Sequence, residues 1–285
     1  MKYGLRKLNV IKNTYRITKT DIMQGIWKRW YLFILILPIV FYQNIQLISS
    51  LELQNRLGNI DSVLPSTMDY IIYFFEGMLE YIPNENPFEI PIMFLSVNMI
   101  PILIIAYYPV NDFQERSKII FTRTGNRSSW WYSKCIWNLM SIFIFYIILY
   151  LGIFIFSALR GTTSFMPTAE ILKLKYGVIG ELSLTMLFLY EIILPILTTM
   201  ALSLLQMTLS IIFSPIYGVV MQVLILIISA FYISPLLPGN YLMFMRNFLY
   251  REDGIRFIFS VMICLCISIF SIICGKVFVD RKDIL

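Results

Sequence analysis

The sequence predicts an all-α polytopic membrane protein: a single transmembrane domain over residues 1–285, with six transmembrane helices. Three observations lead to this fold class. The chain is 58% hydrophobic and only 14% charged, whereas soluble domains carry about 25% charged residues. Its apolar residues gather in runs of about 20, the length that crosses a bilayer. Its basic residues gather in alternate connections between these runs, as the positive-inside rule expects.

The first segment, 1–30, is expected to be a basic cytoplasmic leader. It holds eight Lys or Arg residues, and Asp21 is its one acid. Ile22, Ile26 and Trp30 are spaced four residues apart, which favours an amphipathic interface helix on the inner leaflet. A plain basic flank of the first span is an equally weighted alternative. The first transmembrane helix is expected at 31–50.

An acidic outer loop is expected at 51–89, before the second transmembrane helix at 90–109. The stretch from Leu51 to Ile90 holds seven acids and one base. Its apolar middle, 69–82, is too short and too acidic to span, so we expect an amphipathic segment resting on the outer interface. These acids would attract a cationic, amphipathic peptide. Alternatively, they only follow the charge asymmetry of the membrane.

A cytoplasmic loop is expected at 110–135, because five basic residues stand there between two apolar runs. The pattern predicts a short helix from Asp112 to Phe121, with Asp112 at its N-cap and Glu115 three residues on. Gly125 and Asn126 would end it. The segment is either an ordinary positive-inside loop or a surface that docks a cytoplasmic partner.

The second half of the chain repeats the alternation of apolar runs and connections. Seven basic residues fall in the outer segments and sixteen in the inner ones, which predicts that both termini are cytoplasmic. The connection before the last span contains Pro235, Pro238 and Gly239, and it is expected to form a re-entrant or interfacial hairpin, or else an apolar surface loop. The expected elements are transmembrane helix 136–158, outer loop 159–181, transmembrane helices 182–213 and 216–234, outer hairpin 235–254 and transmembrane helix 255–278.

Polar residues inside the spans are candidates for a translocation pathway. Glu191 is the one acid well within a predicted span, where a charged group is costly. Thr199, Ser203 and Gln206 follow it on the same helical face. Helix packing through hydroxyl groups is the alternative, and it is favoured for the serines and threonines. Gln222 and Asn98 are weaker pathway candidates.

No catalytic, cofactor or metal-binding pattern accompanies these features. The chain has no histidine, which removes the commonest catalytic base and metal ligand. It also lacks a nucleotide-binding P-loop, and no pair of its four cysteines has zinc-ligand spacing. We therefore expect a chain that is not an enzyme, binds no cofactor or metal itself, and has no nucleic-acid partner.

The six spans, the interface helix, the charged loop QERSKIIFTRTGNRSSWWYSK and the broken outer hairpin SPLLPGNYLMFMRN together resemble the permease subunit of ABC-2 type transporters. They resemble in particular members from Gram-positive bacteria that are linked to bacteriocins or peptide antibiotics. In that family the charged loop is the coupling helix, and the hairpin is a re-entrant outer element. The long acidic outer loop departs from the most compact members.

The resemblance implies a bacterial plasma-membrane protein that forms a pathway for a hydrophobic or amphipathic compound, with an antimicrobial peptide as a candidate. Its partners would be a second permease chain and two copies of a separate cytoplasmic ATPase, which would bind ATP and Mg. The alternative is a non-transporting membrane immunity, sensor or assembly protein. The residues implied in docking the ATPase are Asp112, Glu115, Arg116, Lys118, Arg123 and Arg127.

Overall fold

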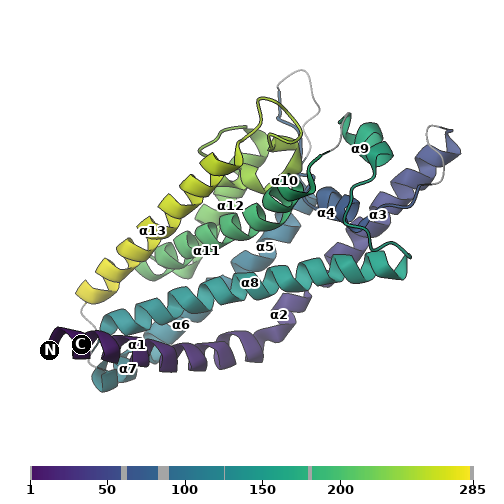
Figure 1. Ribbon diagram of the computed structural model, residues 1–285. Helices are drawn as coiled ribbons and strands as arrows, with labels where there is room; N and C mark the ends of the chain where they lie inside the picture. Colours follow the sequence, from purple (N-terminus) through teal and green to yellow (C-terminus); the bar gives the residue numbers. More distant parts are fainter. Residues whose placement is uncertain (1, 59–62, 83–89, 125, 179–181, 283–285) are drawn as a thin grey trace.

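The computed structural model describes residues 2–58, 63–82, 90–124, 126–178 and 182–282. Within these ranges every regular element is a helix, apart from one isolated bridge between Asn247 and Ile255. The all-α prediction is therefore confirmed for the described residues. The long helices lie side by side in an elongated bundle (Figure 1). In chain order the α-helices are α1 (Lys2–Asp21), α2 (Trp30–Ile34), α3 (Ile36–Arg56), α4 (Thr67–Phe74), α5 (Ile92–Ala106), α6 (Tyr108–Glu115), α7 (Ser117–Thr124), α8 (Arg127–Leu159), α9 (Ala169–Tyr176), α10 (Leu184–Phe188), α11 (Leu194–Ile212), α12 (Pro215–Phe231) and α13 (Phe257–Arg281).

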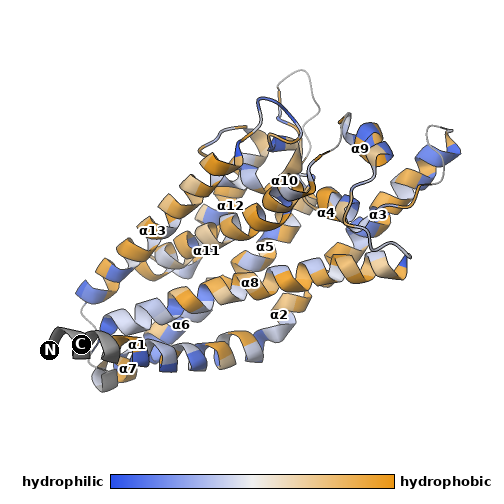
Figure 2. Ribbon diagram, in the orientation of Figure 1, coloured by the Kyte–Doolittle hydropathy of each residue, from blue (hydrophilic) through white to orange (hydrophobic). Residues whose placement is uncertain are grey.

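Five helical segments are long and apolar enough to cross a membrane, and α12, at 17 residues, is shorter. These five segments and α12 overlap the six predicted spans one by one. Five of the six reach the length of a membrane span, and α12 does not. Hydrophobic residues run along these helices, while hydrophilic residues gather toward the ends of the bundle (Figure 2). The five segments are Val10–Arg56, Ile92–Glu115, Arg127–Leu159, Leu184–Ile212 and Phe257–Arg281.

The leader continues into the first span through an irregular stretch. A π-helical turn at Ile22–Ile26 and a 3-10 turn at Trp27–Arg29 connect α1 to α2. The wide π turn shifts the register of side chains, so Ile26 is buried while Trp30 is exposed. The prediction that Ile22, Ile26 and Trp30 form one apolar face is therefore wrong.

The first half of the apolar middle of the outer loop is buried rather than resting on the surface. Ser66 and Asp69 form a capping box that begins α4. The helix then packs against α3 and α8. The expectation of an interfacial segment is wrong for 67–74, because both faces of this short helix find apolar neighbours. Its buried apolar residues are Met68, Tyr70, Ile71, Ile72 and Phe74.

The loop after α5 contains two short helices instead of one. Pro109 stands in the first turn of α6, where proline favours initiation, so this helix begins earlier than predicted. Asp112 is consequently inside α6 and is not an N-cap. The helix breaks at Arg116, and α7 follows to Thr124. Gly125, predicted to end the helix, lies outside the described residues.

The connection between α12 and α13 folds inward. The 3-10 turn Pro238–Leu242 packs against α11, α12 and α13, and Arg246 of a second turn, Phe244–Arg246, donates to the Ala230 carbonyl of α12. The Phe244 amide donates to the Phe75 carbonyl at 2.7 Å, which attaches this connection to the segment after α4. Its backbone polar groups thus find partners within the protein.

The start of α1, the end of α13 and α7 lie together at one end of the bundle, which we call the basal end (Figure 1). α4, α9 and the end of α3 lie toward the other end, which we call the distal end. The first helix therefore begins, and the last helix ends, at the same end of the molecule.

Candidate functional site

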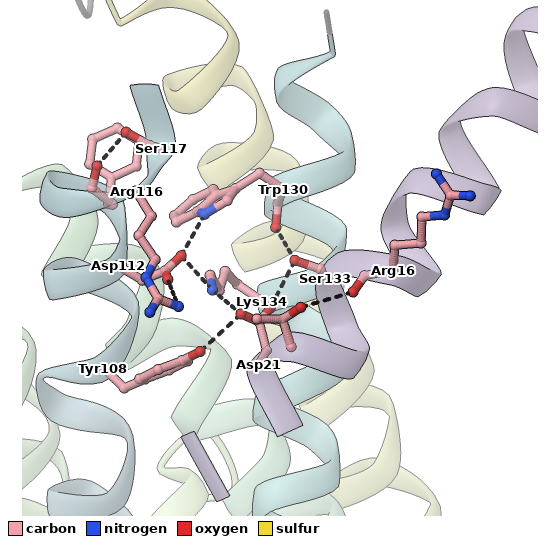
Figure 3. Close-up of polar contacts among 11 residues, drawn as sticks. Arg16, Asp21, Tyr108, Asp112, Arg116, Ser117, Trp130, Ser133 and Lys134 are labelled. Atoms are coloured by element: carbon pink, nitrogen blue, oxygen red, sulfur yellow. Dashed lines mark hydrogen bonds and ion pairs between the residues drawn. The ribbon is translucent and has the colours of Figure 1, made fainter. Parts of the chain in front are cut away.

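Three helices meet at the basal end around one buried ammonium group, Lys134 on α8. Its Nζ lies 2.5 Å from Asp21 Oδ1 at the end of α1 and 2.6 Å from Asp112 Oδ2 on α6. The three side chains point toward one another (Figure 3). Lys134 is fully buried, and the two aspartates are nearly so. This arrangement, which we call the basal ion cluster, joins the leader, the α6 helix and the third predicted span.

Neutral donors complete the coordination of both carboxylates. The Tyr108 hydroxyl donates to Asp21 Oδ1 at 2.9 Å, and the Ser133 hydroxyl donates to Asp21 Oδ2 at 3.0 Å. The Trp130 indole N–H donates to Asp112 Oδ2 at 2.9 Å. Buried carboxylates are tolerated when their lone pairs are satisfied in this way.

The cluster is close to electrically neutral. Lys134 and the half-buried Arg116, 3.8 Å from Asp112 Oδ1, balance the two aspartates. Removing one member of a buried ion pair leaves an uncompensated charge and costs about 3–5 kcal/mol. The basal ion cluster therefore favours one fixed relation between α1, α6 and α8.

The residues expected to dock a partner occupy different environments. Asp112 is buried in the cluster, so its carboxylate is not at the surface. Glu115 and Lys118 are exposed on either side of the break between α6 and α7. Arg116 lies between them and contacts Asp112. The side chain of Arg123 lies outside the described residues.

Arg127 has a separate role at the basal end. Its Nη1 donates to the carbonyl oxygens of Asp280 and Lys282, at 3.0 Å and 2.9 Å. The Ser128 hydroxyl donates to the Asp280 carboxylate. The start of α8 is thus tied to the end of α13, which brings the last helix into the same assembly as α6 and α1.

The sequence prediction missed Asp21, Tyr108 and Trp130 as members of this site. It counted Lys134 only as one of the five basic residues of the cytoplasmic loop. Two signals were present: Asp21 is the single acid in a basic leader, and Lys134 stands at the edge of an apolar run. A lone charge at such a place needs a partner, but nothing in the sequence pairs residues 113 positions apart.

The predicted polar face of α11 contacts neighbouring helices. Thr199 Oγ1 lies 2.7 Å from the Tyr146 hydroxyl on α8. The Ser203 hydroxyl donates to Asn138 Oδ1, also on α8, at 2.6 Å. Gln206 donates to the carbonyl of Ile102 on α5 at 2.9 Å. Each of these three residues therefore forms a hydrogen bond to a neighbouring helix, as the helix-packing alternative expects.

Glu191 lies in a π-helical turn, Leu189–Ile193, between α10 and α11. Its Oε1 accepts a hydrogen bond from Asn247 Nδ2 at 3.0 Å, and both residues are buried. Tyr150 on α8 donates to the Glu191 carbonyl at 2.8 Å. π turns are frequent at functional positions. This acid holds the inward-folded connection against the bundle.

Asn98 and Gln222, the weaker pathway candidates, are both buried, on α5 and α12. Asn98 donates to the Phe94 carbonyl within its own helix. It also lines a cavity of about 450 Å³ between α3, α5 and the segment after α4. Gln43 and Glu76 contribute further polar groups to its wall, together with aromatic side chains.

Two acids of the outer segment are partnered within the chain. Asp69 accepts hydrogen bonds from the Thr168 amide and hydroxyl. Burial raises the pKa of Asp69, although these bonds act in the opposite direction. Glu76 pairs with Lys175 at 2.9 Å. Burial raises the pKa of Glu76 and lowers that of Lys175. These two carboxylates therefore present less free negative charge than the sequence suggested.

Comparison with known proteins finds no matching family model, no similar curated protein and no similar solved structure.

Proposed function

We propose that this chain is the permease subunit of an ATP-binding cassette transporter, with six membrane crossings and both termini cytoplasmic. In this proposal α12 makes the fifth crossing, since about 17 residues is the lower limit for a spanning helix. Two copies of a separate ATPase and a second permease chain complete the complex. The basal end is the cytoplasmic end.

The observation that carries the proposal is the broken helix α6–α7. Its first part, α6, ends the candidate span Ile92–Glu115. The broken helix presents the exposed Glu115 and Lys118, and it is bound to the rest of the bundle through Asp112. A docking element needs both properties: an exposed charged face for the partner and a rigid attachment behind it. Here the attachment leads through Lys134 to α8 and through Asp21 to the leader.

The substrate that we propose is a hydrophobic or amphipathic compound. The cavity of about 450 Å³ mixes aromatic walls with the amides of Gln43, Gln46 and Asn98. Its volume falls in the range of small-molecule sites, about 300–1,000 Å³. An antimicrobial peptide would thus enter by one or a few side chains rather than as a whole.

The test is retention of an ATPase by the tagged chain, purified from its native membrane. The substitutions Glu115→Lys and Lys118→Glu each reverse one exposed charge outside the basal ion cluster. We expect each to lower the amount of bound ATPase by at least about tenfold, because partly desolvated charge pairs at interfaces contribute about 2–5 kcal/mol. Lys12→Glu, on the exposed face of α1, is the matched control and should retain the ATPase.

Full retention of the ATPase by both variants would show that α6–α7 does not dock it. If no ATPase copurifies even with the parent chain, the result favours the alternative function, a membrane immunity, sensor or assembly protein without transport.

A further inference from the structure

A second cavity, of about 390 Å³, lies at the basal end between the leader and α6. Lys28 and Arg29 of the 3-10 turn line it on one side. Tyr108 and Asn111 of α6 line the other side, and Gln24 of the π turn adds an amide. Its wall therefore brings together cationic groups and neutral hydrogen-bonding groups from two elements that are far apart in the sequence.

The charge available in this cavity is positive. Asp112 and Arg116 also line it, but they are engaged with each other and with Lys134. Among the described residues, neither Lys28 nor Arg29 has a carboxylate within ion-pair distance. Arg29 stacks over the Tyr108 ring at 5.4 Å, which holds its guanidinium at the wall. Glu115, exposed at the rim, is the remaining acid.

Exposed aromatic residues lie near this cavity, on the leader, α2 and the residue before α6. Trp27, Trp30, Tyr31 and Tyr107 all have more than half of their surface exposed. Tryptophan and tyrosine at the end of an apolar span mark the headgroup region of a bilayer. In a chain that crosses the membrane as proposed, the level of these residues corresponds to the headgroup region, where lipid phosphate groups lie. Directly beyond it, Ile34 and Leu35 continue the exposed apolar surface along α2 and into α3.

We infer that this cavity binds the headgroup of an anionic phospholipid from the leaflet at the basal end. Lys28 and Arg29 bind the phosphate, and Gln24 and Asn111 hydrogen-bond to the polar part of the headgroup. The acyl chains lie along Trp30, Ile34 and Leu35. A bound lipid would hold the leader against α6, immediately beside the basal ion cluster. This site does not depend on the proposed transport function, because binding is a property of the isolated chain.

The test is native mass spectrometry of the full chain in a neutral detergent, titrated with phosphatidylglycerol or phosphatidylcholine. We expect one phosphatidylglycerol per chain to bind in preference to phosphatidylcholine. The double variant Lys28→Gln/Arg29→Gln should weaken phosphatidylglycerol binding about 30-fold, since each basic residue near an anionic headgroup contributes a factor of about five. Lys12→Gln/Lys19→Gln removes the same charge from exposed leader positions and should change binding less than about twofold.

Equal weakening by both double variants would overturn the inference, because it would indicate diffuse attraction to the leader without a built site. Equal binding of both lipids by the parent would overturn it as well. A further arm adds inorganic phosphate as the competitor. Displacement of the lipid by millimolar phosphate would reassign the cavity to a soluble anion, whereas retention of the lipid supports a site that also holds the acyl chains.

Discussion

At the scale of single residues, Lys134 is the buried cation that both carboxylates of the basal ion cluster share. One ammonium group with three donors bonds to carboxylates from two separate elements, a geometry that a compact cation permits. Because all three groups are buried, the protein gains a fixed arrangement rather than a large net stabilisation. Each member is consequently costly to remove alone.

Lys134→Met should destabilise the chain by about 3–5 kcal/mol, because Asp21 and Asp112 would remain buried without their cation. Thermal unfolding of the purified protein in detergent measures this loss. Lys118→Met, at an exposed position, should change the unfolding temperature little. The triple variant Asp21→Asn/Asp112→Asn/Lys134→Met removes the three buried charges together, leaves the half-buried Arg116 in place, and should recover much of the loss. Equal stability of the two single variants would contradict the role of Lys134.

A pH dependence is expected from Asp69 at the distal end. Burial raises its pKa above the ordinary value of 3.8, so the folded chain binds this proton more tightly than the unfolded chain. The contribution of this group to the free energy of unfolding is fully present below the ordinary pKa of 3.8. It is lost as pH rises through the raised pKa.

Asp69→Asn should therefore flatten the decline in unfolding temperature from acidic toward neutral pH. Glu76, whose pKa burial also raises, contributes in the same direction and remains in the variant. The comparison of parent and variant across a pH series isolates Asp69. An unchanged slope in the variant would show that this carboxyl does not titrate differently in the folded and unfolded states.

Individual residues of the site were only partly predictable. Glu115 and Lys118 were named through the family resemblance, and both are exposed in the structure, so their docking role stays a prediction. Asp21 and Lys134 pair across 113 residues, and such a contact depends on how α1 returns to α8. Thr199, Ser203 and Gln206 were placed on one helical face, but their partners on α8 and α5 follow from packing alone.

At the scale of elements, two π-helical turns interrupt helices that the sequence suggested were regular. Gly25 lies in the first turn, where an added Cβ would come within 2.3 Å of the Trp137 indole. The turn therefore brings the leader backbone close to α8. The second turn carries Glu191 toward Asn247. Hydrophobic periodicity predicts that a helix exists, but one inserted residue changes which side chains share a face.

Asn247→Asp should release the inward-folded connection between α12 and α13. The substitution replaces the donor to Glu191 by a second carboxylate, which costs the buried hydrogen bond, about 1–3 kcal/mol, and adds repulsion. Trypsin cleavage of the purified chain after Arg246, which is 1% exposed, should then increase. Cleavage after the exposed Arg251 serves as the internal reference.

The swapped pair Glu191→Gln/Asn247→Asp restores one donor and one acceptor, and it should return cleavage after Arg246 toward the parent rate. If Asn247→Asp alone leaves that rate unchanged, the hydrogen bond does not hold the connection in place.

At the scale of the whole molecule, the path of the chain supports the six crossings that we propose. Arg127 at the start of α8 bonds to Asp280 and Lys282 at the end of α13. α1 and α8 meet at the same end through Asp21 and Lys134. A chain that begins and finishes at one end of a bundle fits the even number of crossings that we propose. The charge count of the sequence led to the same expectation, although length alone identifies five helices.

Single cysteines in a variant without native cysteines test this topology in intact cells. If α12 crosses the membrane in addition to the five long segments, Ser214→Cys and Lys282→Cys should react with an impermeant thiol reagent only after the membrane is opened. Thr163→Cys and Ser234→Cys should react from outside in intact cells, because they lie beyond the distal ends of α8 and α12. Thr122→Cys on α7 provides a further basal position. Labelling of Lys282→Cys from outside, with Thr122→Cys protected, would mean an odd number of crossings after α7. Such a result would place the end of α13 and the start of α8 on opposite sides of the membrane. The contact between Arg127 and Asp280 could then not form in the membrane-embedded protein.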